Sequence, residues 1–306
     1  MATWLITGGC GFIGSHLADA LIARGDGVRI LDDLSTGKRE NVSSRCEIIV
    51  GDVSQDGVVA AAMEGVDGCW HLAAIASVAR SNEAWVATHR VNLTGTIQVL
   101  DAARRVGKGE AIPVVYASSA AVYGDNIAIP LNETSSTVPL TAYGADKLGS
   151  ELHARVAAQV HGLSSTGLRF FNVYGPRQDP FSPYSGVISI FAQKIMRKEP
   201  ITLHGSGNQT RDFIYVGDVV RFLLKAMACG QGRAEVYNVC SGQQIAIIDL
   251  ARLLFRVCGH EVEIQHAPAR TGDIQVSLGN PEQAARQLGI RVETALEEGL
   301  RKTLAF

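Results

Sequence analysis

The stretch TGGCGFIG, residues 7–14, follows an apolar run and precedes a segment with the pattern of a helix. Its glycines at positions 9, 11 and 14 form a GxGxxG sequence. Glycines at this spacing allow a tight turn and a close approach of backbone N–H groups to a pyrophosphate, which the positive end of the helix dipole also favours. Taken alone, the motif fits an ordinary turn equally well, so its meaning depends on the sequence around it.

The next apolar run, VRILD at residues 28–32, ends in an acidic side chain. Asp32 stands eighteen residues after Gly14. In a dinucleotide-binding unit, an acidic residue at about this distance accepts hydrogen bonds from the adenosine ribose and repels the 2′-phosphate of NADP. By itself Asp32 also fits a capping or turn aspartate. Together with the glycine loop, it predicts a site for NAD.

Short apolar runs alternate with helix-length segments through the first half of the chain. The runs typical of buried parallel strands are WLIT, VRILD, EIIVGD, CWHLAA and PVVYASS. This alternation predicts a doubly wound, Rossmann-type α/β domain over residues 1–172. A loop dense in Pro, Gly and Ser follows, and then shorter elements. They predict a smaller α+β ligand-binding lobe over residues 173–306, with the chain crossing back to the first domain.

Composition narrows the class of partner. The chain has 306 residues and a net charge of −2, which gives no electrostatic reason to expect nucleic acid or an anionic membrane. Its apolar runs are shorter than the ~18 residues of a membrane span, and the N-terminus lacks the basic start of a signal peptide, so we expect a cytoplasmic protein. The six cysteines show no metal-binding spacing, which predicts mostly buried, reduced thiols and no structural metal.

A second group of residues carries acid/base chemistry. Ser119 ends the predicted strand PVVYASS, and the carboxyl ends of parallel strands face the ligand crevice. Tyr143 and Lys147 are four residues apart in TAYGADKLGSELHARV, so a helix places them on one face. A neighbouring ammonium lowers a tyrosine pKa, which predicts a tyrosine that can take a proton from a sugar hydroxyl. Taken alone, Ser119 is also typical of a helix cap or a turn. The Tyr143 and Lys147 pair alone is also typical of a solvated helix face.

The motifs TGGCGFIGSHL, HLAA, VNLTGT, SSAAVYG, YGADK, LRFFNVYGPRQ and TRDFIYVGDVV occur in this order. With them the chain resembles the extended short-chain dehydrogenase/reductases, and within these the nucleotide-sugar 4-epimerases of the UDP-galactose 4-epimerase type, from residue 3 to near the end. The resemblance implies that Tyr143 removes the proton of the sugar 4-hydroxyl. Hydride then passes from C4 to NAD and returns to the other face of a 4-keto sugar. It also implies that Lys147 holds the nicotinamide ribose and that Ser119 bonds the sugar oxygen.

The same resemblance assigns binding residues. For the cofactor they are Gly8, Gly11, Phe12, Ile13, Asp32, Asp52, Val53, Leu72, Ala73, Ala74, Asn92, Tyr143 and Lys147. For a UDP-sugar they are Ser119, Asn172, Val187, Thr202, Arg211, Arg270, Asp273 and Ser277. The side chains of Leu72, Ala73 and Val53 are equally typical of the hydrophobic core around a strand. Either arginine could instead form an ion pair at the surface. A homodimer is implied as well, through helices at residues 83–106 and 140–160.

Three positions bear on the reaction and the sugar. Related 4,6-dehydratases carry an Asp-Glu pair directly after the serine, whereas this chain has Ala120 and Ala121 there. Sugar-acid decarboxylases of the family usually have a Glu at the position of Ala121. The alanines favour epimerisation, since they cannot supply the acid/base work of an elimination. Ser277 stands where the family lines the sugar pocket near C2, and a small residue there leaves room for an N-acetyl group. The expected substrates are therefore UDP-Glc/UDP-Gal and UDP-GlcNAc/UDP-GalNAc.

Two other functions remain open at this point. A UDP-glucuronate 4-epimerase would share the chemistry but must bind a C6 carboxylate, for which the sequence offers no assured partner. A non-catalytic NAD-sensing regulator would use the same fold. Such proteins typically lose the Tyr/Lys pair, which this chain keeps.

Overall fold

The computed structural model describes residues 1–105, 111–180, 186–229, 234–269 and 274–305. The chain forms two compact units. The first consists of Met1–Val122, Pro139–Arg169 and Val220–Tyr237, and the second of Tyr123–Val138, Phe170–Val219 and Asn238–Phe306. The chain therefore passes from one unit to the other several times. The assignment of residues 1–172 to cofactor and 173–306 to sugar stays a prediction.

A seven-stranded sheet forms the centre of the first unit. Its order is β10-β6-β5-β4-β1-β2-β3. The strands are β1 (Thr3–Thr7), β2 (Gly27–Asp32), β3 (Glu47–Val50), β4 (Gly68–His71), β5 (Val114–Ser119), β6 (Ser165–Phe170) and β10 (Ala234–Val239). The pairs β1–β2, β1–β4, β2–β3 and β4–β5 are parallel. The strand order reverses between β1 and β4, which is where ligands bind in such sheets. The predicted Rossmann-type α/β fold is confirmed.

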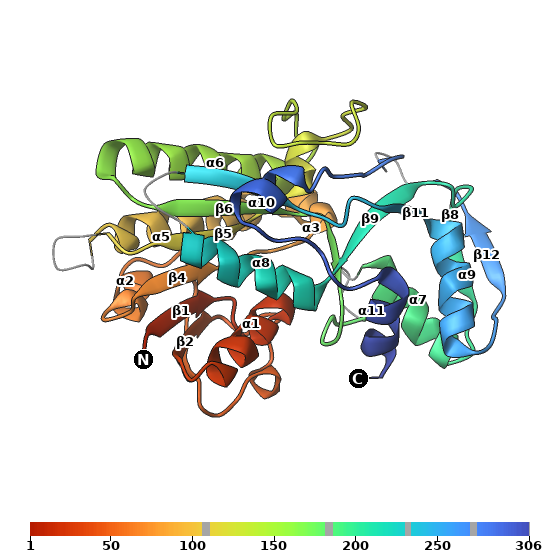
Figure 1. Ribbon diagram of the computed structural model, residues 1–306, viewed down its shortest axis with the longest axis horizontal. Coiled ribbons are helices and arrows are strands. Elements are labelled where there is room, and N and C mark those ends of the chain that lie inside the picture. Colours follow the sequence, from red (N-terminus) through yellow and green to blue (C-terminus); the bar gives the residue numbers. More distant parts are fainter. Residues whose placement is uncertain (106–110, 181–185, 230–233, 270–273, 306) are drawn as a thin grey trace. The chain divides into compact units, whose positions relative to one another are not determined.

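Helices cover both faces of this sheet (Figure 1). The helices are α1 (Phe12–Ala23), α2 (Val58–Met63), α3 (Val78–Glu83), α4 (Trp85–His89), α5 (Gly95–Ala103), α6 (Ala142–His161) and α8 (Val216–Cys229). Helices α2, α5 and α6 share one hydrophobic cluster with the sheet. Trp70 of β4 donates from its indole nitrogen to the carbonyl oxygen of Leu223 in α8, 3.0 Å away. Two short 3-10 turns, Arg39–Asn41 and Ala120–Tyr123, complete the regular structure of this part.

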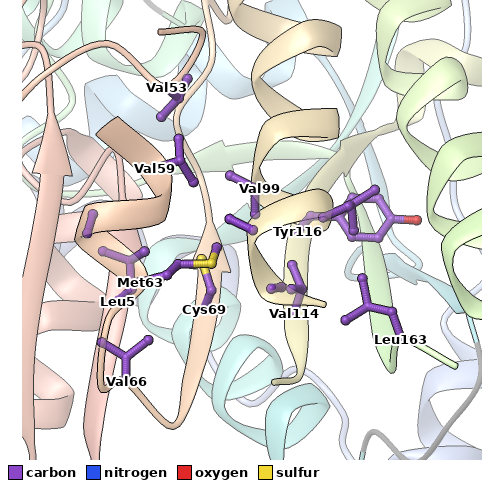
Figure 2. Packing of buried hydrophobic residues seen from close by; sticks show 14 of the residues in the cluster. Leu5, Val53, Val59, Met63, Val66, Cys69, Val99, Val114, Tyr116 and Leu163 are labelled. Carbon is purple, nitrogen blue, oxygen red and sulfur yellow. The ribbon is translucent and has the colours of Figure 1, made fainter. Parts of the chain in front are cut away.

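Figure 2 shows the hydrophobic cluster on the α2 and α5 side of the sheet. Met63 of α2 is fully buried near Leu5 of β1 and Cys69 of β4. Val99 of α5 packs above Val114 of β5. Buried apolar side chains of this size each contribute roughly 1.5–3 kcal/mol to stability. This layer therefore fixes the strands whose carboxyl ends carry the predicted site.

The helix expected at residues 83–106 is interrupted, which corrects the sequence prediction. Ala84 separates α3 from α4 with the non-helical dihedral angles φ −118° and ψ 54°. A π-helical turn, Arg90–Thr94, then joins α4 to α5. It carries Asn92, whose side chain accepts from the backbone nitrogen of Ile75 at 2.8 Å and donates to its oxygen at 3.2 Å. Apolar spacing does not reveal such a turn, because the apolar pattern continues through it.

A buried ion pair attaches α6 to the sheet. The guanidinium of Arg169 in β6 donates to both oxygens of Glu151 in α6, at 2.8 and 2.7 Å. The hydroxyl of Ser118 in β5 donates to Glu151 Oε1 at 2.5 Å. All three side chains are buried. The contact joins one helix to two strands at a fixed register, since a bidentate pair tolerates little displacement.

The second unit contains two small sheets and four helices among its described residues. The strands are β7 (Asn172–Tyr174), β8 (Ile201–His204), β9 (Thr210–Tyr215), β11 (Gln244–Ala246) and β12 (Ile264–Ala267), and the helices are α7 (Val187–Met196), α9 (Ile247–Cys258), α10 (Glu282–Gln287) and α11 (Leu296–Leu304). Strand β9 lies between antiparallel β11 and parallel β7, and β8 pairs with β12. Helices α7, α9 and α11 share a hydrophobic core with β8 and β9.

The cysteines, the helices and the clusters of possible metal ligands were each predicted from the sequence and can be compared with the structure. All six cysteines are free thiols, and Cys10, Cys46, Cys69 and Cys240 are buried. Cys229 is exposed, against the general expectation of burial. Within the described ranges, no helix has the length and apolar character to cross a membrane, and no cluster of His, Cys, Asp or Glu could hold a metal ion.

The ion pair between Glu151 and Arg169 generates a stability prediction. Arg169→Met leaves the Glu151 carboxylate buried without its charge partner, so we expect a loss on the order of 3–5 kcal/mol in the free energy of unfolding. Urea denaturation followed by circular dichroism measures the loss. The control is Arg301→Met, which removes an exposed i,i+4 pair with Glu297 and is expected to cost about 0.5 kcal/mol or less. Equal losses for the two variants would contradict the role given to the buried pair.

Candidate active site

The loop between β1 and α1 is shaped for a close approach of its backbone to a ligand and to its neighbours. Gly8 has φ +69°, and a Cβ there would lie 2.7 Å from the backbone nitrogen of Ala73. A Cβ at Gly14 would collide with the carbonyl oxygen of Gly8. Helix α1 begins at Phe12 behind Gly11, and no side chain caps it. Its first N–H groups, those of Phe12 and Ile13 among them, are thus oriented for an anion such as a pyrophosphate.

Asp32 ends β2, the strand beside the loop. Its Oδ2 accepts from the backbone nitrogen of Cys10 at 2.9 Å, and Oδ1 accepts from that of Leu34 at 2.8 Å. Burial raises the pKa of this carboxyl, while the two backbone hydrogen bonds lower it. A Cβ at Gly37 would lie 2.8 Å from Oδ1, so the space beside the carboxylate exists because position 37 is a glycine. Each oxygen keeps a free lone pair with which to accept a ribose hydroxyl.

The other residues predicted for the cofactor follow neighbouring strands. Leu72 and Ala73 come after β4, and their backbone nitrogens donate to the backbone oxygen and the hydroxyl of Thr7, at 3.0 and 3.2 Å. Ala74 follows them. Asp52 and Val53 come after β3, and Val53 packs in the hydrophobic cluster of Figure 2. Asn92 is fully buried on its π-helical turn. The carboxyl edge of the sheet therefore holds the whole predicted cofactor set, and these residues fit NAD.

Ser119, Tyr143 and Lys147 meet at the carboxyl end of β5, within the first unit. Helix α6 begins with Thr141 as its cap, whose hydroxyl accepts from the nitrogen of Gly144 at 3.1 Å. One turn after Tyr143, the Nζ of Lys147 donates to the carbonyl oxygen of Ala117 in β5 at 2.9 Å and lies 5.8 Å from the centroid of the Tyr143 ring. The hydroxyl of Ser119 acts on the phenol of Tyr143 and lowers its pKa. The three groups form one acid/base cluster.

The protonation behaviour of this cluster differs from the sequence prediction. Lys147 was expected to lower the pKa of Tyr143. Burial instead raises the pKa of Tyr143, and the hydroxyl of Ser119 opposes this only in part. Lys147 is itself buried, which lowers its pKa to about 8. Its ammonium is directed at the oxygen of Ala117 rather than at the phenol, so desolvation outweighs its attraction for the phenolate.

The two alanines after Ser119 enter a 3-10 turn. The backbone nitrogen of Ala121 donates to Ser119 Oγ at 3.1 Å, which orients the serine side chain. Ala120 and Ala121 bring no ionisable group next to the cluster. Ser119, Tyr143 and Lys147 thus stay the residues predicted for acid/base chemistry at this point of the fold.

Of the residues predicted for the sugar nucleotide, those that the structure describes lie in the second unit, apart from Ser119. Asn172 in β7 donates from Nδ2 to the carbonyl oxygen of Asp212 at 3.0 Å. Arg211 in β9 donates from Nη1 to the carbonyl oxygens of Thr210 and Ile274, at 2.9 and 2.6 Å. Ser277 is buried and donates from its backbone nitrogen to the oxygen of Thr210 at 3.1 Å. These three residues gather around one small sheet.

The remaining sugar-nucleotide residues have separate positions. Val187 starts α7 and Thr202 lies in β8, both partly buried. Arg270 and Asp273 lie outside the described residues. Their assignment, like that of the other binding residues, stays a prediction.

Sequence reasoning missed several groups that support the cluster. The buried hydroxyl of Ser81 accepts from the backbone nitrogen of Tyr143 at 3.1 Å. The side chain of Asp146 is buried beside Lys147 and lies 2.8 Å from His89. A threonine just before an apolar helical run signals the cap at Thr141. No local pattern reveals Ser81 or the pairing of Asp146, because their partners are 62 and 57 residues away in the chain.

Comparison with known proteins identifies the family. The model of the NAD dependent epimerase/dehydratase family matches residues 4–240. The chain belongs to this family. The resemblance seen in the motifs is thereby confirmed, and NAD is the cofactor of this epimerase/dehydratase.

Solved structures of the family share the fold throughout. They include a UDP-glucose 4-epimerase of Thermotoga maritima with UDP-glucose (34% identity, TM-score 0.95, 99% of this chain and 97% of that one). A UDP-N-acetylglucosamine 4-epimerase of Methanobrevibacter ruminantium with UDP-N-acetylmuramic acid has 33% identity and a TM-score of 0.94 over 99% and 97% of the chains. A UDP-glucose 4-epimerase of Thermus thermophilus with NAD has 35% identity and a TM-score of 0.92 over 99% and 98%.

The burial of Lys147 predicts a dependence of stability on pH. Its pKa is lowered from 10.5 to about 8 in the folded protein, so the unfolded state binds more protons between these pH values and wild-type stability rises with pH there. Below pH 8 the full penalty for the buried ammonium, on the order of 3 kcal/mol, is present. Lys147→Met lacks this penalty. We expect it to be more stable than wild type at pH 7, with the difference shrinking as pH rises toward 10.5.

Urea denaturation at several pH values, on protein freed of nucleotide, measures this difference. Lys225→Met, at an exposed position on α8, is the control and should show no such convergence. A difference between Lys147→Met and wild type that stays constant from pH 7 to 10.5 would contradict the assignment.

Proposed function

We propose that this protein is an NAD-dependent 4-epimerase of UDP-hexoses. The observation that carries the proposal is the cluster of Ser119, Tyr143 and Lys147 at the carboxyl end of β5, in the same unit as the glycine loop and Asp32. A phenol, an ammonium and a hydroxyl in this arrangement are able to move a proton to and from a sugar hydroxyl. The named relatives act on UDP-sugars, and the cluster supplies the proton chemistry that such a 4-epimerisation requires.

The proposed mechanism assigns each residue one task. NAD, when bound, supplies the hydride acceptor and donor for C4 of the sugar and a positive charge that favours the phenolate form of a nearby tyrosine. Tyr143 takes the proton of the 4-hydroxyl and later returns it to the 4-keto oxygen. Ser119 hydrogen-bonds the same oxygen and orients the phenol. Lys147 binds the nicotinamide ribose and stabilises negative charge on Tyr143.

The neighbourhood of Ser119 favours epimerisation over elimination. Loss of water across C5 and C6 needs an acid and a base beyond the tyrosine. Ala120 and Ala121 offer neither. The two positions after Ser119 therefore supply no carboxylate that could act as the acid or base of a dehydratase or a decarboxylase.

The substrate range is proposed from Ser277. Its side chain is small and its residue is buried beside β9. In the family this position lines the pocket near C2 of the sugar, so a serine leaves space for an N-acetyl group. We propose that UDP-GlcNAc/UDP-GalNAc are accepted besides UDP-Glc/UDP-Gal. Arg211 and Arg270 are proposed to bind the diphosphate, together with Asn172, while Asp273 bonds the ribose and Val187 and Thr202 flank the uracil.

A direct assay distinguishes these functions. Purified protein is incubated separately with UDP-galactose, UDP-GalNAc and UDP-glucuronate, and the anomeric proton signals are followed by NMR. Conversion of UDP-galactose and UDP-GalNAc to their C4 epimers supports the proposal. Conversion of UDP-galactose alone removes the argument from Ser277 but keeps the reaction. Conversion of UDP-glucuronate alone favours the glucuronate epimerase, and no conversion with added NAD favours the regulator.

The role of Tyr143 predicts a specific loss of turnover. Tyr143→Phe removes the hydroxyl that carries the proton, so we expect kcat to fall by about 10²–10⁴-fold while NAD binding and the fold persist. Tyr116→Phe is the matched control. It removes a buried phenol hydroxyl on β5 that has no hydrogen-bond partner in the described part of the chain, and it should keep its activity. A folded, active Tyr143→Phe enzyme would exclude this residue as the base.

The role of Ser277 predicts a change of specificity. Ser277→Tyr fills the space proposed for the N-acetyl group. The value of kcat/KM for UDP-GalNAc should therefore fall at least about tenfold more than the value for UDP-galactose, which corresponds to a steric penalty of about 1.4 kcal/mol or more. Ser206→Tyr, on an exposed turn of the same unit, should change neither. Equal losses for both sugars would show that position 277 does not face C2.

A homodimer is proposed from an exposed apolar surface of the first unit. Leu152, Val156 and Val160 of α6 are 50%, 52% and 66% exposed and recur every four residues, so they form a stripe. Trp85 and Val86 of the neighbouring α4 are 65% and 76% exposed. Exposed apolar side chains of this kind are typical of an interface, and a second copy of the chain fits them because the stripe on α6 can pack against itself in a two-fold arrangement.

Val156→Asp should convert the dimer to a monomer, because it buries a carboxylate at the centre of the stripe. Light scattering at fixed protein concentration measures the mass. The control is Ile127→Asp, which charges a still more exposed apolar residue of a loop and should leave the mass unchanged. A monomeric mass for the wild type would remove the proposal.

A further inference from the structure

One buried carboxylate differs from all the others that the structure describes. The buried acids are Asp32, Asp146, Glu151, Asp212 and Asp218. In four of them both oxygens accept hydrogen bonds. The exception is Asp146, whose Oδ1 lies 2.8 Å from His89 Nδ1 while Oδ2 is buried without a partner among the described residues. Leaving a charged oxygen unpaired in the interior is costly, so the retention of this carboxylate calls for an explanation.

The neighbour of Asp146 supplies that explanation. Lys147 follows it on α6, and the two residues are 4% and 3% exposed. The ammonium is directed to Ala117 on β5, whereas the carboxylate is directed to His89 on α4. The two groups therefore make no direct ion pair. Their attraction still acts over this separation, because the interior screens charge far less than water does.

The other titratable groups around Lys147 leave it no free negative charge at neutral pH. The carboxylate of Glu151, one turn further along α6, is paired with the guanidinium of Arg169. Burial lowers the pKa of His71 on β4 to about 3, so it is neutral, and both its ring nitrogens are engaged by Thr7 and Thr96. Burial raises the pKa of Tyr143, so the phenol is neutral in the protein without ligands. The lowered pKa of Lys147 is opposed by Asp146 alone among the charged groups that act on it.

We infer that Asp146 is a positioning residue whose buried carboxylate, held by His89, keeps Lys147 protonated and so sets the upper pH limit of the acid/base cluster. The catalytic part of this inference rests on the function proposed above for Lys147. Its electrostatic part concerns the free protein and can be tested without substrate. Asp146 acts through Lys147 and touches no reacting atom.

The first test measures the titration of Lys147 itself. Protein freed of nucleotide is labelled with 13C at the ε-carbon of lysine, and the Lys147 signal is assigned by its loss in Lys147→Met. In Asp146→Asn the midpoint should lie about 0.5 pH units or more below that of wild type, because an attractive charge has been removed. Asp146→Glu retains the charge and should restore most of the difference. An unchanged or higher midpoint in Asp146→Asn would overturn the inference.

Two controls separate electrostatics from structure. Asp101→Asn removes a partly exposed carboxylate on α5 and should leave the Lys147 midpoint where it is. The melting temperature of Asp146→Asn should stay close to that of wild type, since the amide oxygen can replace the carboxylate oxygen that lies beside His89; a large decrease would indicate a merely structural carboxylate and count against the inference. If Asp146→Asn does not fold, the inference is tested on the wild-type protein instead. The 13Cγ signal of Asp146 must then shift with the same midpoint as Lys147, and a signal without that inflection would overturn the inference.

The second test uses turnover. With NAD and UDP-galactose, the ratio of kcat/KM of Asp146→Asn to that of wild type should fall as pH rises, by up to about threefold for a midpoint shift of 0.5 pH units. If the ratio of the two kcat/KM values does not change with pH, the catalytic part of the inference is overturned. If wild type converts no UDP-sugar, the proposed function fails, whereas the titration of Lys147 still decides whether Asp146 acts on it.

Discussion

The bidentate pair of Glu151 and Arg169, with Ser118 as a third member, is the contact on which the arrangement of the proposed catalytic residues depends. It joins α6 to β5 and β6 in the interior, where a displaced charge has no water to replace its partner. Tyr143 and Lys147 lie on the same helix, two turns and one turn before Glu151. Ser119 follows Ser118 directly on the strand. One ion pair therefore positions the phenol, the ammonium and the serine hydroxyl relative to one another.

The same burial that fixes these groups works against their charged forms. Desolvation lowers the pKa of Lys147 and raises that of Tyr143, so the free protein holds a neutral phenol beside an ammonium that loses its proton at about pH 8. A base of this kind becomes effective when positive charge is added next to it. The oxidised cofactor would bring such a charge, and the proposed base would then gain strength when the cofactor binds. Asp146 acts in the other direction, since it stabilises the ammonium.

Much of the fold and of the cofactor site follows from local patterns. The glycine loop and Asp32 were recognisable because a tight turn, a helix N-terminus and a strand end each leave a short signature. The pair Tyr143 and Lys147 follows from helical spacing alone. The break at Ala84 and the π-helical turn at Asn92 were not recognisable, because apolar periodicity continues across both. The sequence predicts a lowered pKa for Tyr143, whereas burial raises it. The reason for this difference is that the sequence shows a cation four residues away but not the depth of burial.

The sequence by itself determined the order of strands and helices, the glycine loop, the acidic residue at the end of β2 and the residue types of the proposed catalytic cluster. These are properties of short segments, in which spacing and residue type impose the geometry. Only the tertiary structure decided that Ser81 supports Tyr143, that Arg169 pairs with Glu151, and that Asp146 is buried between His89 and Lys147. Such contacts join residues far apart in the chain, and burial, which sets their electrostatic strength, is a property of the packed fold.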